Sequence, residues 1–538
     1  MNTENQNTIT NDIPKDWWLG LKQNFTYDFT AGLLVFLLAL PLSLGIAKAA
    51  EFPPAMGVLS AMIAGLLGSL LGGSHLTIKG PAAGLITITA GCVLEMGGGM
   101  EGWHLALGVM VVAGILQIVL GFMKAGALSY FFPHSAVHGM LAAIGIIIIS
   151  KQIHVMLGID PADLAGMEPD ELLAEIPHSL SRMNMLLGTV GVGSLVLMFF
   201  WHRIGFSFLR KIPAPMVILL LAIPCAIAFD FKSTQPDHAL VQIGDFWGTV
   251  AFNPDFSAIG TVTFWKYVIM FLLIGSLESL LTVKAIDSID PWKRESDFNK
   301  DLWGIGAANT MTACLGGLPA ISEVARSSAN VELGARTRWS NFFHGCFLLL
   351  AMLLFIPVIE LIPNAALAAM LVFVGYRLTA PHLYFKIYKV GSEQLTIFLV
   401  TVMVTVETDL LVGMASGILT KFIFHIVNGA KFDNLFKPRY KLTYEDGIYR
   451  MTFFGAAIFS NLIGFKKVLK NLESGKEVVL DFQHADLVDH TFMEYLERFE
   501  EIYVNRGGAV NVVGFEQFQR FSNHPLSGRK AKRQVRVA

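Results

Sequence analysis

The sequence predicts an α-helical membrane protein with about fourteen transmembrane segments, followed by a small α/β domain. Only 15% of the 538 residues are charged and 54% are hydrophobic, whereas soluble domains carry about 25% charged residues. From about residue 30 to 427, apolar stretches near the ~20 residues needed to span a bilayer follow one another. After about residue 437 the hydrophobic stretches become short and alternating, as in strands.

The composition also excludes several classes of protein. Lys and Arg number 40 against 42 Asp and Glu, so no basic surplus is available for nucleic acid. The four cysteines stand singly in apolar stretches, without metal-ligand spacing. Because no nucleophile–base pair or metal cluster is evident in the sequence, we predict a protein that is not an enzyme and needs no cofactor.

The apolar region divides into nine long segments and five shorter ones. The long segments lie at about 30–50, 53–72, 103–123, 133–150, 184–201, 213–230, 264–286, 339–360 and 410–428. The shorter, Gly- or Pro-broken ones lie at about 81–95, 301–314, 321–333, 364–377 and 394–407. Basic residues concentrate in alternate loops, which predicts a multi-pass protein of the cell inner membrane with both termini cytoplasmic.

Four regions are expected along the chain: a cytoplasmic segment at 1–28, a transmembrane domain at 29–430, an α/β domain at 437–525 and a basic tail at 526–538. In the α/β domain, alternation predicts strands at 448–454, 477–482 and 509–514. Helical periodicity predicts helices at 462–473 and 491–505. The tail is expected to be solvated or to touch lipid headgroups.

The membrane part contains an internal repeat. Motifs that begin at residues 42, 71 and 133 recur in the same order at 278, 315 and 363, at offsets of 236, 244 and 230. Such a recurrence indicates two structural repeats. Seven spans in each half force the second half to insert upside down, and inverted repeats of this kind are typical of secondary transporters with a site near the membrane midplane.

The broken segments of the two halves predict that site. In residues 72–84, Pro81 fits the first position of a half-helix. In residues 316–322, Ser322 fits a helix N-cap. Two half-helices that start near mid-membrane would direct free N–H groups and positive dipole ends at one spot, which suits an anion. The alternative is that both segments are Gly-rich breaks for helix packing.

The motifs at these breaks resemble the sulfate permease family, also called solute carrier family 26. They are residues 40–47 and 80–84 in the first half and residues 315–345 in the second, including Arg326-Ser-Ser-Ala-Asn330. The C-terminal domain is similar to the STAS domain of sulfate transporters and anti-sigma antagonists. The resemblance implies a seven-plus-seven inverted repeat with core and gate subdomains, anion transport by an elevator-like movement, and a homodimer in the lipid bilayer.

The resemblance also implies a cation site. In the sodium-dependent bicarbonate transporters of the family, an acidic residue and a Thr match Glu278 and Thr282, and small residues at the half-helix start complete the site. A Na⁺ ion at Glu278, Thr282 and Ser322 is therefore expected, although Glu323 and Val324 depart from the family's Ala and Thr. The second carboxylate either completes a sodium site or replaces sodium with a proton.

Charged residues inside the spans leave alternatives open. A carboxylate at the depth of Glu278 costs at least ~2.5 kcal/mol, so the alternative is a packing-buried group paired with Lys79, Lys284 or Arg326. Lys79 either faces the anion or balances an acidic residue. Arg326 matches the family's Arg on the second half-helix and would supply a full positive charge.

The loop Asp489-His490-Thr491 of the STAS-like domain has His490 where the anti-sigma antagonists carry a phosphorylatable Ser. We therefore expect no phosphorylation switch there, and expect Thr491 to cap the following helix. No partner of this domain is predicted.

Together these observations predict a secondary transporter of small inorganic or carboxylate anions, with bicarbonate and sulfate as substrates and Na⁺ or H⁺ as coupling ion. The predicted substrate contacts are Gly80, Ala82, Ala83, Ser322, Glu323 and Arg326, and the predicted coupling residues are Glu278, Thr282 and Glu323. The alternatives are an uncoupled anion exchanger or channel, a nucleobase transporter of the same architecture, and a membrane receptor whose cytoplasmic domain is the output.

Overall fold

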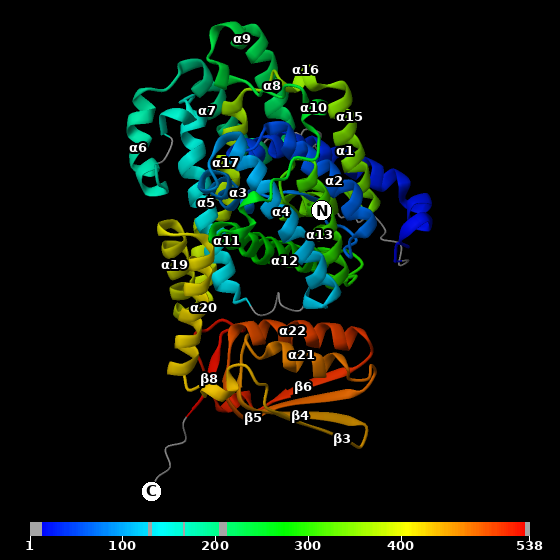
Figure 1. Ribbon diagram of the computed structural model, residues 1–538. Helices are drawn as coiled ribbons and strands as arrows, with labels where there is room; N and C mark the ends of the chain where they lie inside the picture. The colour runs from blue at the N-terminus through cyan, green and yellow to red at the C-terminus, as the bar shows by residue number, and fades with distance from the viewer. Residues whose placement is uncertain (1–12, 127–131, 165–166, 204–211, 533–538) are drawn as a thin grey trace. The chain divides into compact units, whose positions relative to one another are not determined.

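A computed structural model describes residues 13–126, 132–164, 167–203 and 212–532 of the chain (Figure 1). The first twelve residues of the expected N-terminal segment and the last six of the expected tail lie outside this description. The chain divides into two compact units. One comprises Met1–Gly126 and Ile147–Tyr376, and the other Ala127–Ile146 and Arg377–Ala538.

A helix occupies each of the fourteen predicted spans. The other ends agree to within about six residues, but α1 begins at Trp17, thirteen residues before the predicted start at residue 30. The first half contains α1 (Trp17–Ala49), α2 (Pro54–Leu71), α3 (Ile86–Glu95), α4 (Gly99–Phe122), α5 (His134–Met156), α7 (Met185–Phe200) and α8 (Ala214–Ala228). The second contains α11 (Val262–Met270) continuing into α12 (Ser276–Ile289), then α13 (Phe298–Cys314), α14 (Val324–Glu332), α15 (Trp339–Leu354), α17 (Asn364–Leu378), α19 (Ser392–Glu407) and α20 (Leu410–Val427). In each half the third element is a short helix, as the repeat predicts.

The predicted membrane fold is confirmed. Among the described residues, seven helices are long and apolar enough to cross a membrane by length and composition. Four shorter apolar helices of 10–17 residues accompany them. The join of α11 and α12 is a π-helical turn, Phe271–Gly275, and such turns are frequent at functional sites.

Among the described helices longer than four residues, two were not predicted. The acidic loop after α5 contains α6 (Pro169–Ser181), whose start forms a capping box between Glu168 and Glu171. Residues 381–390 form α18 (Pro381–Val390), with Pro381 in its first turn. Both are amphipathic surface helices with too many polar residues to be recognised as spans.

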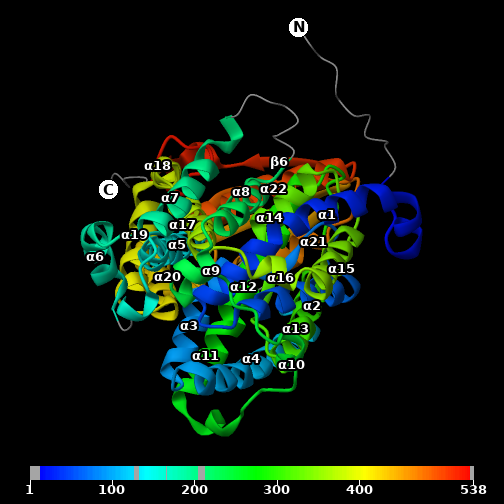
Figure 2. The ribbon, with the colours of Figure 1, turned by 90° about the horizontal axis from the view of Figure 1, so that it is seen from above.

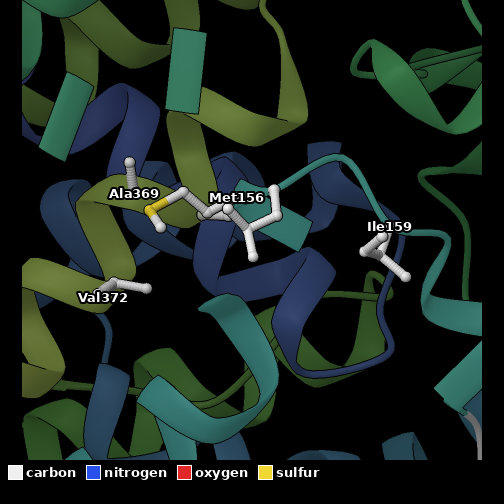
Figure 3. Packing of buried hydrophobic residues seen from close by; sticks show 6 residues of the cluster. Met156, Ile159, Ala369 and Val372 are labelled. Atoms are coloured by element: carbon white, nitrogen blue, oxygen red, sulfur yellow. The ribbon is translucent and has the colours of Figure 1, made fainter. Parts of the chain in front are cut away.

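Small residues allow the helices of the first unit to pack closely. Met156 at the end of α5 packs with Ala369 and Val372 of α17 (Figure 3). Figure 2 shows α1, α2 and α15 near one another. A Cβ added at Gly65 of α2 would lie 2.9 Å from the Cα of Gly345 in α15, so these two backbones are in direct contact.

The C-terminal domain is a mixed six-stranded sheet with two helices on one face (Figure 1). The strands are β3 (Tyr440–Glu445), β4 (Ile448–Ala457), β5 (Glu477–Val488), β6 (Ala509–Val513), β7 (Phe518–Arg520) and β8 (Arg529–Ala531), and the helices are α21 (Leu462–Lys470) and α22 (His490–Asn505). The predicted strands correspond to β4, β5 and β6, which pair in parallel through the central β5. Phe453 and Phe482 stack at 4.2 Å in its core.

Two predictions for this domain were wrong. Arg529–Ala531 is not part of a solvated tail, because it forms β8 against β5 and β7, with Arg529 buried over the Phe515 ring. Asp489, not Thr491, caps α22 by accepting a hydrogen bond from the Phe492 amide at 2.8 Å. The Thr491 hydroxyl instead accepts one from Lys421 Nζ of α20 at 3.0 Å.

Candidate functional site

The two broken segments meet in the first unit. β1 (Lys79–Pro81) and β2 (Ala320–Ser322) form an antiparallel pair in which Lys79 lies opposite Ser322 and Pro81 opposite Ala320. Each strand leads directly into a half-helix, α3 through a 3₁₀ turn at Ala83–Leu85 and α14 through Glu323. The predicted convergence of the half-helix starts is therefore observed.

The details of the helix starts differ from the predictions. Pro81 is the last residue of β1 rather than the first of a helix. Glu323, not Ser322, caps α14, because its carboxylate accepts a hydrogen bond from the Arg326 amide at 2.8 Å. Ser322 lies in β2, where its amide donates to Ser279 Oγ at 3.1 Å. A carboxylate is a strong N-cap and interacts favourably with the positive end of the helix dipole.

Buried side chains satisfy the extended backbone on both sides of the strand pair. The Lys79 amide donates to Asn341 Oδ1 at 3.1 Å, and the Ala320 amide donates to Asn309 Oδ1 at 2.7 Å. Asn309 Nδ2 in turn donates to Gln117 of α4 at 3.0 Å. Extended backbone at membrane depth is tolerated only where the protein supplies such partners, so this network fixes the position of both strands.

Lys79 is paired with a carboxylate that the sequence reasoning missed. Its Nζ lies 2.7 Å from Asp301 Oδ1 and 3.1 Å from the hydroxyl oxygens of Thr77 and Ser322. Asp301 is fully buried and also accepts the amide of Gly73. Lys79 therefore balances an acidic residue, as one of the two alternatives held. Asp301 could have been recognised from the sequence, because it is a carboxylate at the start of the apolar span predicted at 301–314.

Arg326 is fully buried in the first turn of α14. None of its three guanidinium nitrogens has a hydrogen-bond partner within the described part of the chain. The guanidinium lies against β1, since a Cβ added at Gly80 would be 2.6 Å from Nη1. A buried guanidinium is costly unless an anion or acceptor accompanies it, so the chemistry of this group suits an anion beside the two helix starts.

Glu278 of α12 lies against the start of the other half-helix. A Cβ added at Gly84 would be 2.6 Å from its carboxyl carbon. Glu278 is buried, and its Oε1 has no hydrogen-bond partner in the described ranges. The alternative in which Glu278 pairs with Lys79 is not observed, because the Lys79 ammonium is paired with Asp301.

The remaining predicted residues are buried near these groups. Ala82 and Ala83 form the entrance to the first half-helix, at 3% and 7% exposure. Thr282 is buried one helical turn after Glu278. The α12 side chain that hydrogen-bonds the Ser322 backbone is Ser279 rather than Thr282, and the Ser322 hydroxyl already contacts the Lys79 ammonium at 3.1 Å.

Comparison with known proteins identifies the family. Residues 25–401 match the family described as the sulfate permease family. YvdB of Bacillus subtilis (strain 168) is 30% identical over 415 residues, covering 75% of this chain and 74% of YvdB. The bicarbonate transporter BicA of Picosynechococcus is 24% identical over 419 residues, covering 77% of this chain and 72% of BicA.

A solved structure supports the same assignment at the level of fold. The murine Slc26a9 anion transporter in its inward-facing state superposes with a TM-score of 0.65 at 16% identity, covering 90% of this chain and 85% of that chain. The sheet and helices of the C-terminal domain are consistent with a STAS domain. The chain is a multi-pass membrane protein and belongs to the sulfate permease family, whose members are transporters rather than enzymes.

Proposed function

We propose that the chain is a secondary active transporter of small inorganic anions, which bind where β1 and β2 meet. The observation that carries this proposal is the buried Arg326 guanidinium, which has no hydrogen-bond partner among the described residues and lies beside two helix starts. A guanidinium and two helix N-termini together favour an anion over a neutral solute. The names of the relatives point to sulfate and bicarbonate as the substrates to test first.

Different residues contribute different interactions to anion binding. Arg326 supplies the full charge, and the absence of a side chain at Gly80 leaves room for its guanidinium to lie against β1. Ala82 and Ala83 offer backbone N–H groups at the start of the first half-helix. Glu323 opposes the anion at the start of the second half-helix, so neutralising a carboxylate here favours anion binding.

We propose a proton rather than Na⁺ as the coupling ion. The sodium site expected at Glu278, Thr282 and Ser322 would place a second cation beside the Lys79 ammonium, which lies 3.1 Å from Ser322 Oγ. Protonating Glu278 or Glu323 removes one negative charge from the site without any such conflict. The elevator-like movement, the homodimer and the cytoplasmic location of both termini stay predictions that rest on the family resemblance.

The test is uptake of labelled bicarbonate and labelled sulfate into proteoliposomes, with imposed Na⁺ or pH gradients. We expect Arg326→Gln to abolish uptake, and Arg182→Gln, at an exposed arginine outside the site, to retain it. Uptake by Arg326→Gln at the wild-type rate would contradict the proposed site.

Coupling is tested by the dependence of uptake on each gradient. A pH gradient is expected to drive accumulation, and Glu323→Gln to change both uptake and its pH dependence. Accumulation driven by Na⁺ alone would contradict proton coupling. Anion exchange that responds to neither gradient would establish the uncoupled exchanger instead.

A further inference from the structure

Five charged side chains gather around the two half-helix starts: Lys79, Glu278, Asp301, Glu323 and Arg326. We call this group the tip cluster. All of them except Glu323 are buried. They come from β1, α12, α13, and the N-cap and first turn of α14. Because charges interact strongly in a medium of low dielectric constant, the net charge of this cluster acts strongly on any charged group that approaches it.

The tip cluster contains two cations and three carboxylates, so its net charge is −1 when every group is ionised. Lys79 and Asp301 cancel each other at 2.7 Å. Glu323 opposes Arg326, whose backbone amide it accepts at 2.8 Å. Glu278 is left without a cationic partner among the described side chains of the cluster, and its Oε1 has no hydrogen bond. One bound proton therefore brings the cluster to neutrality.

We infer that this charge balance selects monovalent oxyanions over divalent ones, and that Asp301 is a specificity-determining residue. The inference rests on the proposed function. The starts of α3 and α14 each contribute about +0.5 elementary charge, which together matches one negative charge. A divalent anion would leave a further negative charge uncompensated in a buried site, where the cost of burying charge is large. Of the two substrates suggested by the relatives, the site therefore takes bicarbonate in preference to sulfate.

Asp301 acts through Lys79 rather than by touching the anion. Removing its charge leaves the Lys79 ammonium uncancelled, with its Nζ 3.1 Å from the hydroxyl of Ser322. The tip cluster then carries one more positive charge, and a divalent anion becomes more favourable relative to a monovalent one. For a charge several Å from the anion at an effective dielectric constant near 20, the expected change in preference is about tenfold or more.

The test compares two anions of the same tetrahedral shape and different charge. Perchlorate and sulfate compete with labelled bicarbonate for uptake by the full-length protein in proteoliposomes, and the ratio of their half-inhibitory concentrations is measured. Wild type is expected to be inhibited more strongly by perchlorate. Asp301→Asn is expected to shift the ratio toward sulfate by about tenfold.

Two further variants distinguish an effect of charge on anion preference from an effect of structural damage. The double variant Lys79→Met with Asp301→Asn removes both charges, keeps the net charge, and is expected to retain the wild-type ratio even where uptake is slower. Glu323→Gln also removes one negative charge but leaves the Lys79–Asp301 pair intact, so it is expected to shift the ratio toward sulfate even if Asp301→Asn does not fold.

An unchanged ratio in the folded single variants, or a wild type that prefers sulfate, would overturn the inference and leave anion transport standing. A shift in the double variant as large as in Asp301→Asn would also overturn it, because structural change would then explain the result. A folded wild type that takes up none of these anions would instead overturn the proposed function.

Discussion

Replacing Gly84 with Ala tests whether the contact between Glu278 and the first half-helix matters for transport. The added Cβ would lie 2.6 Å from the Glu278 carboxyl carbon, whereas ordinary contacts begin at about 3.4 Å. The carboxylate must therefore move by about 1 Å, away from the start of α3. Overpacking of this size costs about 1–3 kcal/mol, which corresponds to about a 5- to 150-fold change in an equilibrium constant.

The measurement is the KM and maximal rate of anion uptake in proteoliposomes, together with the melting temperature in detergent. We expect Gly84→Ala to raise KM or shift its pH dependence, because the group that moves is the proposed proton acceptor. Gly193→Ala is the matched control, since nothing lies within 4 Å of a Cβ added at Gly193 in α7. If both variants kept wild-type KM and pH dependence, the placement of Glu278 at the site would be refuted.

Three further variants test other contacts. Ser279→Ala leaves the buried Ser322 amide without its acceptor, so we expect the free energy of unfolding to fall by about 1–3 kcal/mol. The measurements are a lower melting temperature and a higher KM for uptake, and wild-type values for both would contradict this role. Lys421→Met leaves the buried Asp489 without the ammonium 3.0 Å away, and we expect the free energy of unfolding to fall by about 3–5 kcal/mol. Adding Asp489→Asn is expected to make this loss smaller. Equal melting temperatures of the single variant and wild type would refute the contribution of this pair. Burial would raise the pKa of Asp489, but Lys421 and then His425 hold it below 3.8, so the stabilisation is fully present at neutral pH and is lost only as the pH falls through that lowered pKa. Burial alone would lower the pKa of His490, but its contact with Glu494 raises this pKa above 6.5. The pair therefore stabilises the domain fully below pH 6.5, and the stabilisation is lost as the pH rises through the raised pKa. His490→Gln is expected to lower the melting temperature more at pH 6 than at pH 8.5, and an equal effect at both pH values would contradict this.

The sequence was sufficient to locate the spans because hydrophobic length and Gly or Pro breaks are local signals. Each predicted span contains a helix, and the breaks at residues 72–84 and 316–322 do lead into short helices. Alternation likewise predicted the three parallel strands of the C-terminal domain. The short β7 and β8 were missed because three-residue strands depend on their neighbours more than on their own pattern.

The site was predictable in its location but not in its contacts. The repeat placed the two breaks together, yet the antiparallel register of Lys79 with Ser322 depends on α13 and α15 as well. The partner of Lys79 is 222 residues away in the chain, and no local pattern specifies such a distance. The caps at Glu323 and Asp489 were missed because a neighbouring Ser or Thr fits the same preference, and only the backbone geometry decides between them.

The pairing of β1 with β2 is made by main-chain atoms, which every amino acid other than proline supplies in full. This pairing therefore does not depend on which side chains these six residues carry, except where a side chain has contacts of its own. Three of the six are more restricted: the Arg326 guanidinium occupies the space a side chain at Gly80 would need, and the side chains of Lys79 and Ser322 contact each other beside Asp301. Charged residues around the strand pair can therefore be exchanged, and the charge offered to an anion changed, without removing the main-chain hydrogen bonds that hold the two helix starts together.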